Sequence, residues 1–122
     1  MVDVMIWSQI KNNYQVISLV LDTGATMTTI STEILRALGY AAHGKDKKRV
    51  TTASGIEYVD AIILDKIMIA GLEFSNISVH SLRFPTESFS KGVIGINILS
   101  NFDMFISLQN KILKLTPVNE NN

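Results

Sequence analysis

Short runs of β-branched and other apolar residues, separated by turn-forming residues, cover most of this chain of 122 residues. Runs of this length and composition predict β-strands, and the residues between them predict turns. The expected strands are Val2–Ile10, Tyr14–Leu21, Val50–Ala53, Ile56–Leu64, Lys66–Ala70, Phe74–Leu82, Met104–Leu108 and Ile112–Thr116. The pattern therefore favours an all-β fold.

Two short segments have helical signals. Ser31 or Thr32 can cap a helix that stops at Gly39, and Asn97 can cap a very short one that runs through Phe102. Many short strands with one or two short helices predict a closed or partly closed barrel. Residues 1–118 are expected to form one domain, followed by a polar tail at 119–122.

Composition narrows the classes of function. The chain is 47% hydrophobic with a mean hydropathy of +0.25, so it can bury a core, and its net charge is zero. No overall electrostatic attraction to nucleic acid or an anionic membrane is expected, and the basic cluster Lys45, Lys47, Lys48 and Arg49 is expected in a solvated loop.

The chain lacks the sequence signals of several other classes of protein. No cysteine is present, which removes disulfides and thiolate chemistry, and His43 and His80 show no metal-ligand spacing. No apolar run approaches the roughly 18 residues of a membrane helix, and the first residues do not resemble a signal peptide. We expect no metal, no cofactor and no membrane contact by this segment, which slightly favours the cytoplasm.

The chemistry is expected where an apolar run, Leu19-Val20-Leu21, leads directly into Asp22-Thr23-Gly24-Ala25. A carboxylate at the end of a buried strand is costly unless it is hydrogen-bonded or functional. Gly24 allows close backbone approach, so that its N–H can donate to the carboxylate, and Thr23 offers a hydroxyl to another backbone. The alternative is an ordinary Asp in a strand-to-turn position.

A second apolar run enters a glycine about 70 residues later, in Gly92-Val93-Ile94-Gly95-Ile96-Asn97. The two features in this order resemble the retropepsin-like aspartic proteases, single-domain relatives of pepsin. In that family the two turns interlock, and a β-hairpin flap between them covers the substrate. The matching segment here is Arg49–Tyr58. Thr26, Met27 and Ile96 depart from the acidic residues and the arginine common in retroviral members, so the chain is more similar to cellular or bacterial members.

The resemblance implies an aspartic endopeptidase that hydrolyses peptide bonds with an activated water. Because the chain carries one Asp-Thr-Gly, it implies a homodimer with Asp22 from each subunit. The implied catalytic residues are Asp22, Thr23 and Gly24, and the implied contacts to an extended peptide or protein substrate are Ala25, Thr52, Ala53, Ser54 and Gly55.

Two alternatives to the dimeric protease stay open at this stage. The domain could be a non-catalytic dimerisation or peptide-binding module that keeps the fold, or the isolated domain could be in a proenzyme-like state that is monomeric and inactive. Asp60, Asp65 and Asp103 are expected to be ordinary strand carboxylates, not partners of Asp22. Apolar walls of a substrate groove are expected from Ile30, Val50, Ile56, Ile94 and Ile96.

Overall fold

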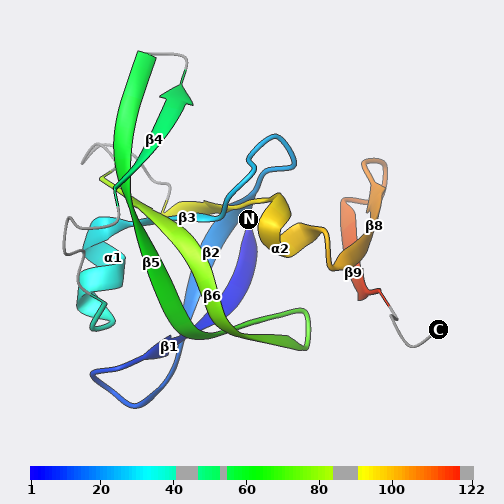
Figure 1. Ribbon diagram of the computed structural model, residues 1–122. Helices are drawn as coiled ribbons and strands as arrows, with labels where there is room; N and C mark the ends of the chain where they lie inside the picture. Colours follow the sequence, from blue (N-terminus) through cyan, green and yellow to red (C-terminus); the bar gives the residue numbers. More distant parts are fainter. Residues whose placement is uncertain (41–46, 53–54, 84–90, 119–122) are drawn as a thin grey trace.

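The structure is a computed structural model that describes residues 1–40, 47–52, 55–83 and 91–118, and it is built almost entirely of strands (Figure 1). The elements are β1 (Val2–Ser8), β2 (Asn13–Leu21), β3 (Thr29–Ser31), α1 (Thr32–Ala37), β4 (Lys47–Thr52), β5 (Gly55–Ile69), β6 (Leu72–Leu82), β7 (Gly92–Ile94), α2 (Ile96–Leu99), β8 (Phe102–Ser107) and β9 (Ile112–Pro117). No helix in the described part of the chain is long and apolar enough to cross a bilayer.

Six strands close into a barrel. The order β1-β2-β7-β3-β6-β5 runs around the sheet, and β1 pairs a second time with β5, at Met5↔Met68 and Ile6↔Ile67. Among the described strands, β4 pairs with β5 alone and stands outside this ring, where it forms a projecting hairpin with the start of β5 (Figure 1). The expectation of an all-β, closed or partly closed barrel is confirmed, and the closed form is the one observed.

The strand β5 differs most from expectation. The sequence predicts two strands, broken at Asp65, whereas β5 is continuous over 15 residues. The ladder to β6 lacks only the pair opposite Asp65, where Asn76 has a φ of 53°, and the Asp65 N–H instead donates to the Tyr40 hydroxyl over 3.2 Å. The prediction of two strands is wrong because a tertiary hydrogen bond satisfies the backbone where the ladder is interrupted.

The interruption at Asp65 also changes which face of β5 is buried. Of the β5 residues in the core cluster, Ile62 and Leu64 come before it and Ile67 and Ile69 come after it, so the core positions change from even to odd numbers. The two halves of β5 therefore present opposite faces to one core. This is why a simple alternation with period two does not run through the whole strand.

The basic cluster is partly strand. Lys47, Lys48 and Arg49 begin β4 and pair with β5 as far as Asp60, while Lys45 lies outside the described residues. The prediction of a loop is wrong for these three residues, because β5 extends far enough to give their backbone a partner. Charged side chains are a common feature of a strand that has one unpaired edge.

The helix α1 ends as predicted. Gly39 has a φ of +99° and donates to the Arg36 carbonyl over 3.0 Å, and the Tyr40 N–H returns to the Leu35 carbonyl over 2.8 Å. These two bonds satisfy carbonyls at the end of the helix and need the left-handed conformation that glycine adopts without strain. Ser31 occupies the N-cap position, but its side chain makes no capping hydrogen bond.

Candidate active site

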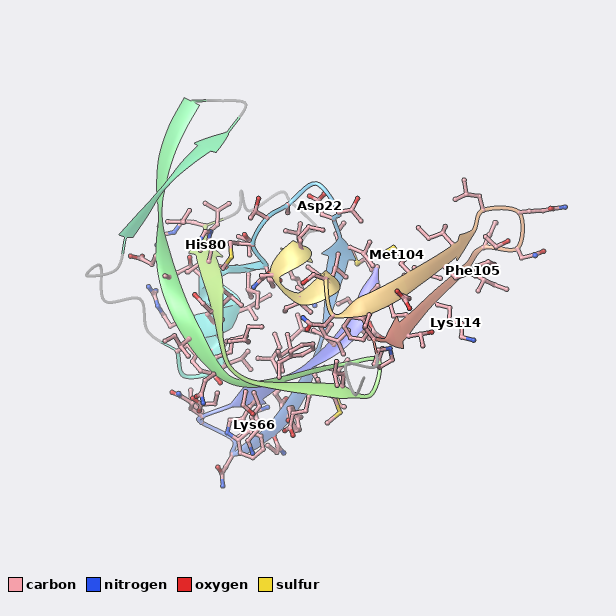
Figure 2. All side chains as sticks on the ribbon, turned by 45° about the vertical axis from the view of Figure 1, so that its right-hand side comes forward. Asp22, Lys66, His80, Met104, Phe105 and Lys114 are labelled. Atoms are coloured by element: carbon pink, nitrogen blue, oxygen red, sulfur yellow. The ribbon has the colours of Figure 1, made fainter. Side chains whose placement is uncertain are left out.

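Tertiary structure brings the two apolar runs side by side. β2 and β7 pair in parallel through Val20↔Val93 and Leu21↔Ile94, and the Asp22 N–H donates to the Ile94 carbonyl over 3.1 Å. Asp22 is therefore held at the end of a central strand, in the loop beside α2 (Figure 2). The adjacency that the resemblance implies for two segments about 70 residues apart is observed.

The turn after Asp22 orients its carboxylate. The Gly24 N–H donates to Asp22 Oδ1 over 2.9 Å, and the Ala25 N–H donates to the Asp22 carbonyl over 3.2 Å. A Cβ atom added to Gly24 would lie 3.3 Å from Asp22 Oδ1, closer than side chains ordinarily pack. The role expected of Gly24, a backbone donor that approaches the carboxylate closely, matches this geometry. Asp22 is half-buried, whereas Thr23 and Gly24 are exposed.

The start of α2 is joined to the same turn. The Ile96 N–H donates to the Ala25 carbonyl over 2.8 Å, and the Asn97 N–H donates to the Thr26 carbonyl over 3.0 Å. At Gly95 an added Cβ would lie 2.5 Å from the carbonyl carbon of Met27, so only glycine fits between the two segments. The Asp22 loop thus rests on α2 through backbone contacts that do not depend on side-chain identity.

Asn97 is not the helix cap that the sequence predicts. Gly95 is the N-cap, α2 covers Ile96–Leu99, and Phe102 begins β8. The Asn97 side chain turns instead toward Thr28, accepting from the Thr28 N–H over 2.7 Å and from its hydroxyl over 2.8 Å. The cap prediction is wrong because the Asn97 amide oxygen accepts hydrogen bonds from Thr28 instead of from the N–H groups at the start of the helix.

Thr28 is a site residue that sequence reasoning missed. Its side chain is fully buried, and its hydroxyl accepts from the Gly95 N–H over 3.0 Å while donating to Asn97. Asn97 Nδ2 adds a bond to the Ser78 carbonyl over 3.0 Å, which links the site to β6. The sequence carries no specific signal for it, because Thr28 lies between Met27 and Thr29 in a stretch rich in threonine.

The predicted substrate contacts are only partly described. Thr52 and Gly55 form the last pair of the β4–β5 ladder, at the end of the hairpin that projects from the barrel (Figure 1). Ala53 and Ser54 lie outside the described residues. The hairpin predicted between the two apolar runs is present, and its contact with a peptide stays a prediction.

The predicted groove walls need a correction. Ile30 and Ile94 are both 0% exposed and belong to the core, so they are wrong as wall residues of an open groove. Both residues lie on strands of the barrel, Ile30 on β3 and Ile94 on β7, and their side chains point to the barrel interior. Ile96 is 40% exposed and remains a candidate, and Val50 and Ile56 lie on β4 and β5.

Other ionisable groups stand apart from the Asp22 turn in their contacts. Asp65 accepts from Gln9 Nε2 over 3.2 Å, and Asp103 is exposed on β8. Asp60 lies on β5, with Oδ1 buried and without a hydrogen-bond partner in the described part of the chain. Among the described residues, no group of three or more His, Cys, Asp or Glu side chains could hold a metal ion.

Solved structures identify the fold class. A retropepsin-like aspartic protease from Rickettsia conorii superimposes with a TM-score of 0.64 at 23% identity, covering 93% of this chain and 79% of that chain. The retroviral protease-like domain of Ddi1 from Leishmania major gives a TM-score of 0.59 at 16% identity, covering 99% of this chain and 94% of that chain. The fold is that of the retropepsin-like aspartic proteases.

The sequence itself gives the family. Residues 8–101 match the family model described as gag-polyprotein putative aspartyl protease, which is more than half of the chain. The chain belongs to this family of aspartyl proteases. A search of curated proteins found no significant match.

Proposed function

We propose that this chain is an aspartic endopeptidase in which Asp22 of two subunits forms the catalytic pair. The observation that carries the proposal is the Asp22 carboxylate, held at a strand end by the Gly24 N–H at 2.9 Å and half-exposed beside Thr23. A catalytic carboxylate needs both a fixed orientation and access to water and substrate.

The proposed chemistry follows from placing two carboxyl groups together. Like charges at close range cannot both ionise, so the pair keeps one proton and acts as acid and base at once. The charged member takes a proton from water, whose oxygen attacks the peptide carbonyl carbon, while the protonated member donates to the carbonyl oxygen. Collapse of the tetrahedral intermediate breaks the C–N bond, and the amine leaves with a proton. The proton belongs to the pair, not to either Asp22.

The remaining site residues have proposed roles around this pair. Thr23, exposed at the turn, would bond across to the partner's loop, and Gly24 would orient the carboxylate. Thr52, Ala53, Ser54 and Gly55 would lie over an extended peptide and bond its backbone, as an added strand would, and Ala25 would line the site without filling it.

Asp22→Asn is expected to abolish hydrolysis and leave the fold intact, because it keeps the side-chain volume and removes the shared proton. The measurement is cleavage of a peptide library from acid to neutral pH by the wild type, by Asp22→Asn and by Asp3→Asn, a matched change at an exposed strand carboxylate. We expect cleavage by the wild type and by Asp3→Asn only, with a rate that falls at both ends of the pH range.

Two outcomes would contradict the proposal. Cleavage by Asp22→Asn at the wild-type rate would remove Asp22 from the mechanism. An absence of cleavage by the wild type, at concentrations where a dimer is shown by sedimentation, would favour the non-catalytic peptide-binding or dimerisation module.

A further inference from the structure

The first half of β6 has a free edge. β3 covers β6 only at residues 80–82, and the strand pairs with β5 along its other side (Figure 1). Just before this covered part, the Ser78 carbonyl accepts from Asn97 Nδ2 over 3.0 Å. Among the described residues, no strand pairs with the outer edge of 73–77. An edge of this kind can accept an extended peptide as an additional strand.

The backbone of this segment directs hydrogen-bonding groups to the free edge. The two-residue turn that joins β5 to β6 sets the backbone groups of Ile69 and Leu72 against each other. In an antiparallel ladder every second residue turns its backbone groups the other way, so those of Glu73 and Ser75 point outward. Both of these residues are exposed. The edge therefore offers donors and acceptors at the spacing that an added strand uses.

A groove of about 590 Å³ lies along the same edge. Of the eight described residues that line it, six are 73–78 of β6, and the other two are Met27 and Asn97. Phe74 and Ile77 contribute apolar surface and also pack on the core, which fixes them in place. Sites for ligands are commonly of this size and combine apolar surface with a few polar groups. The free edge is thus bordered by a space that side chains of a bound peptide can enter.

The groove joins the Asp22 loop at Met27. Met27 follows Asp22 by five residues, so their Cα atoms lie at most about 18 Å apart. Asn97 also contacts both places, because its N–H donates to the Thr26 carbonyl over 3.0 Å and its side chain reaches Ser78 on β6. On the proposed function, an extended peptide crosses Asp22. About five residues of extended chain cover the distance from the cleaved bond to the groove.

Charge indicates which side chain the groove selects. Of the described residues that line it, Glu73 alone is charged. Its Oε1 accepts from the Tyr14 hydroxyl on β2, and this hydrogen bond raises the pKa of Tyr14 to about 12. The phenol therefore remains a donor that orients the carboxylate from acid to neutral pH. A single oriented carboxylate in a groove without other charges favours a basic side chain on the bound peptide.

We propose that residues 73–78 of β6 bind an extended peptide substrate by strand addition, about five residues from the cleaved bond, and that Glu73 selects a lysine or arginine there. The proposal rests on the proposed function, because the occupant is the peptide that crosses Asp22. In a twofold dimer each subunit offers one such groove, one toward each end of the peptide. The preferred substrate is then an extended segment of about ten residues or more.

The first test measures selection of charge in the distal segment, the part of the peptide about five residues from the cut. The substrates share one cleavable core from the peptide library and carry either lysine or glutamate in the distal segment on each side. We expect kcat/KM of the wild type to be about fivefold higher for the lysine peptides, the size that an exposed ion pair allows. The preference should shrink at high salt.

Variants at Glu73 assign this preference to the groove. Glu73→Lys should reverse the order of the two peptides, and Glu73→Gln, which keeps an acceptor for Tyr14, should make them equal. Asp3→Lys is the matched control, because Asp3 is also an exposed strand carboxylate that accepts from a hydroxyl on β2, that of Ser18. It should leave the wild-type order unchanged.

The second test measures strand addition with N-methylated peptides. One backbone amide of the distal segment is methylated at a time, which removes its donor. We expect kcat/KM to fall several-fold at alternate positions only, because every second amide of an added strand faces its neighbour. Peptides that end about three residues from the cut do not reach the groove. The wild type and both Glu73 variants should cleave these short peptides equally, which also shows that the variants fold.

The outcomes separate the groove from the enzyme. A Glu73→Lys protein with the wild-type order of preference, or distal N-methylation without effect, overturns the groove proposal, and cleavage of the core peptide leaves the proposed function standing. A wild type that cleaves no peptide overturns the function. Binding of the same labelled peptides, measured by fluorescence anisotropy, then decides on the groove alone. A charge preference in binding that Glu73→Lys reverses supports it, and equal binding of the two peptides contradicts it.

Discussion

At the scale of single residues, the site depends on two polar side chains that carry no catalytic signature. The fully buried Thr28 hydroxyl bonds both the Gly95 N–H and Asn97 Oδ1, and these bonds join the segment after Asp22 to the start of α2. Both segments must hold their positions for the Asp22 carboxylate to face one direction. On the proposed function, Thr28 and Asn97 are therefore positioning residues, because their hydrogen bonds hold the Asp22 loop against α2.

Thr28→Val is expected to lower the free energy of unfolding by about 1–3 kcal/mol, because the isosteric change leaves the buried Gly95 N–H without its partner. Urea unfolding followed by circular dichroism measures the loss. Thr28→Ser is the control that keeps the hydroxyl, and its loss should be limited to about 1 kcal/mol for the missing methyl. An unchanged or more stable Thr28→Val protein would show that the hydroxyl bonds add nothing.

At the scale of elements, the β5–β6 hairpin organises the barrel. β5 pairs with β4, β6 and β1, so a single strand carries the outer hairpin at one end and closes the barrel at the other. The turn that joins it to β6 lies between the paired residues Ile69 and Leu72, and both of its residues have positive φ, 49° at Ala70 and 81° at Gly71. Two left-handed residues suit a type I′ turn, whose twist matches that of the strands.

Ala70→Asn is expected to stabilise the protein by about 0.5–1 kcal/mol, because asparagine tolerates the left-handed conformation better than alanine does. The reciprocal variant is Asn12→Ala, at a position with a φ of 55°, and it should destabilise by a similar amount. Thermal and urea unfolding of both variants give the two values. Changes of the same sign in the two proteins would contradict the argument from backbone conformation.

At the scale of the whole molecule, one chain provides a barrel, a projecting β4–β5 hairpin and one Asp-Thr-Gly turn. The proposed chemistry needs two such turns, so activity becomes a property of the pair of chains. Two copies related by a twofold axis would supply identical carboxylates from identical loops. The rate per chain should then depend on protein concentration around the dissociation constant of the dimer.

Mixing chains tests this dependence without disturbing the interface. A tenfold excess of Asp22→Asn, equilibrated with the wild type so that subunits exchange, leaves about one wild-type chain in eleven with a wild-type partner. Activity is expected to fall to about one tenth, whereas the same excess of Asp3→Asn should not lower it. Activity that is insensitive to added Asp22→Asn would mean that one chain holds a complete site.

Much of the architecture depends on residues that are close together in the chain, so it can be predicted from the sequence. The alternation of apolar runs and turns predicted most of the strands, Gly39 predicted the end of α1, and the segment Arg49–Tyr58 predicted a hairpin whose strands pair as expected. The strand that leads into Asp22-Thr23-Gly24 was equally predictable, because an apolar run before a carboxylate and a glycine is a pattern within a few residues. Backbone preference and burial act over such short distances, so the sequence is enough.

Only the tertiary structure decided what depends on residues far apart in the chain. It made β5 one strand, because Tyr40 supplies a partner at Asp65, and it turned Asn97 from an expected cap into the partner of Thr28. It buried Ile30 and Ile94 and left Ile106 and Leu113 exposed, although all four are equally apolar in the sequence. Burial and hydrogen-bond partners are set by which segments the closed barrel brings together, and no short stretch of sequence contains that information.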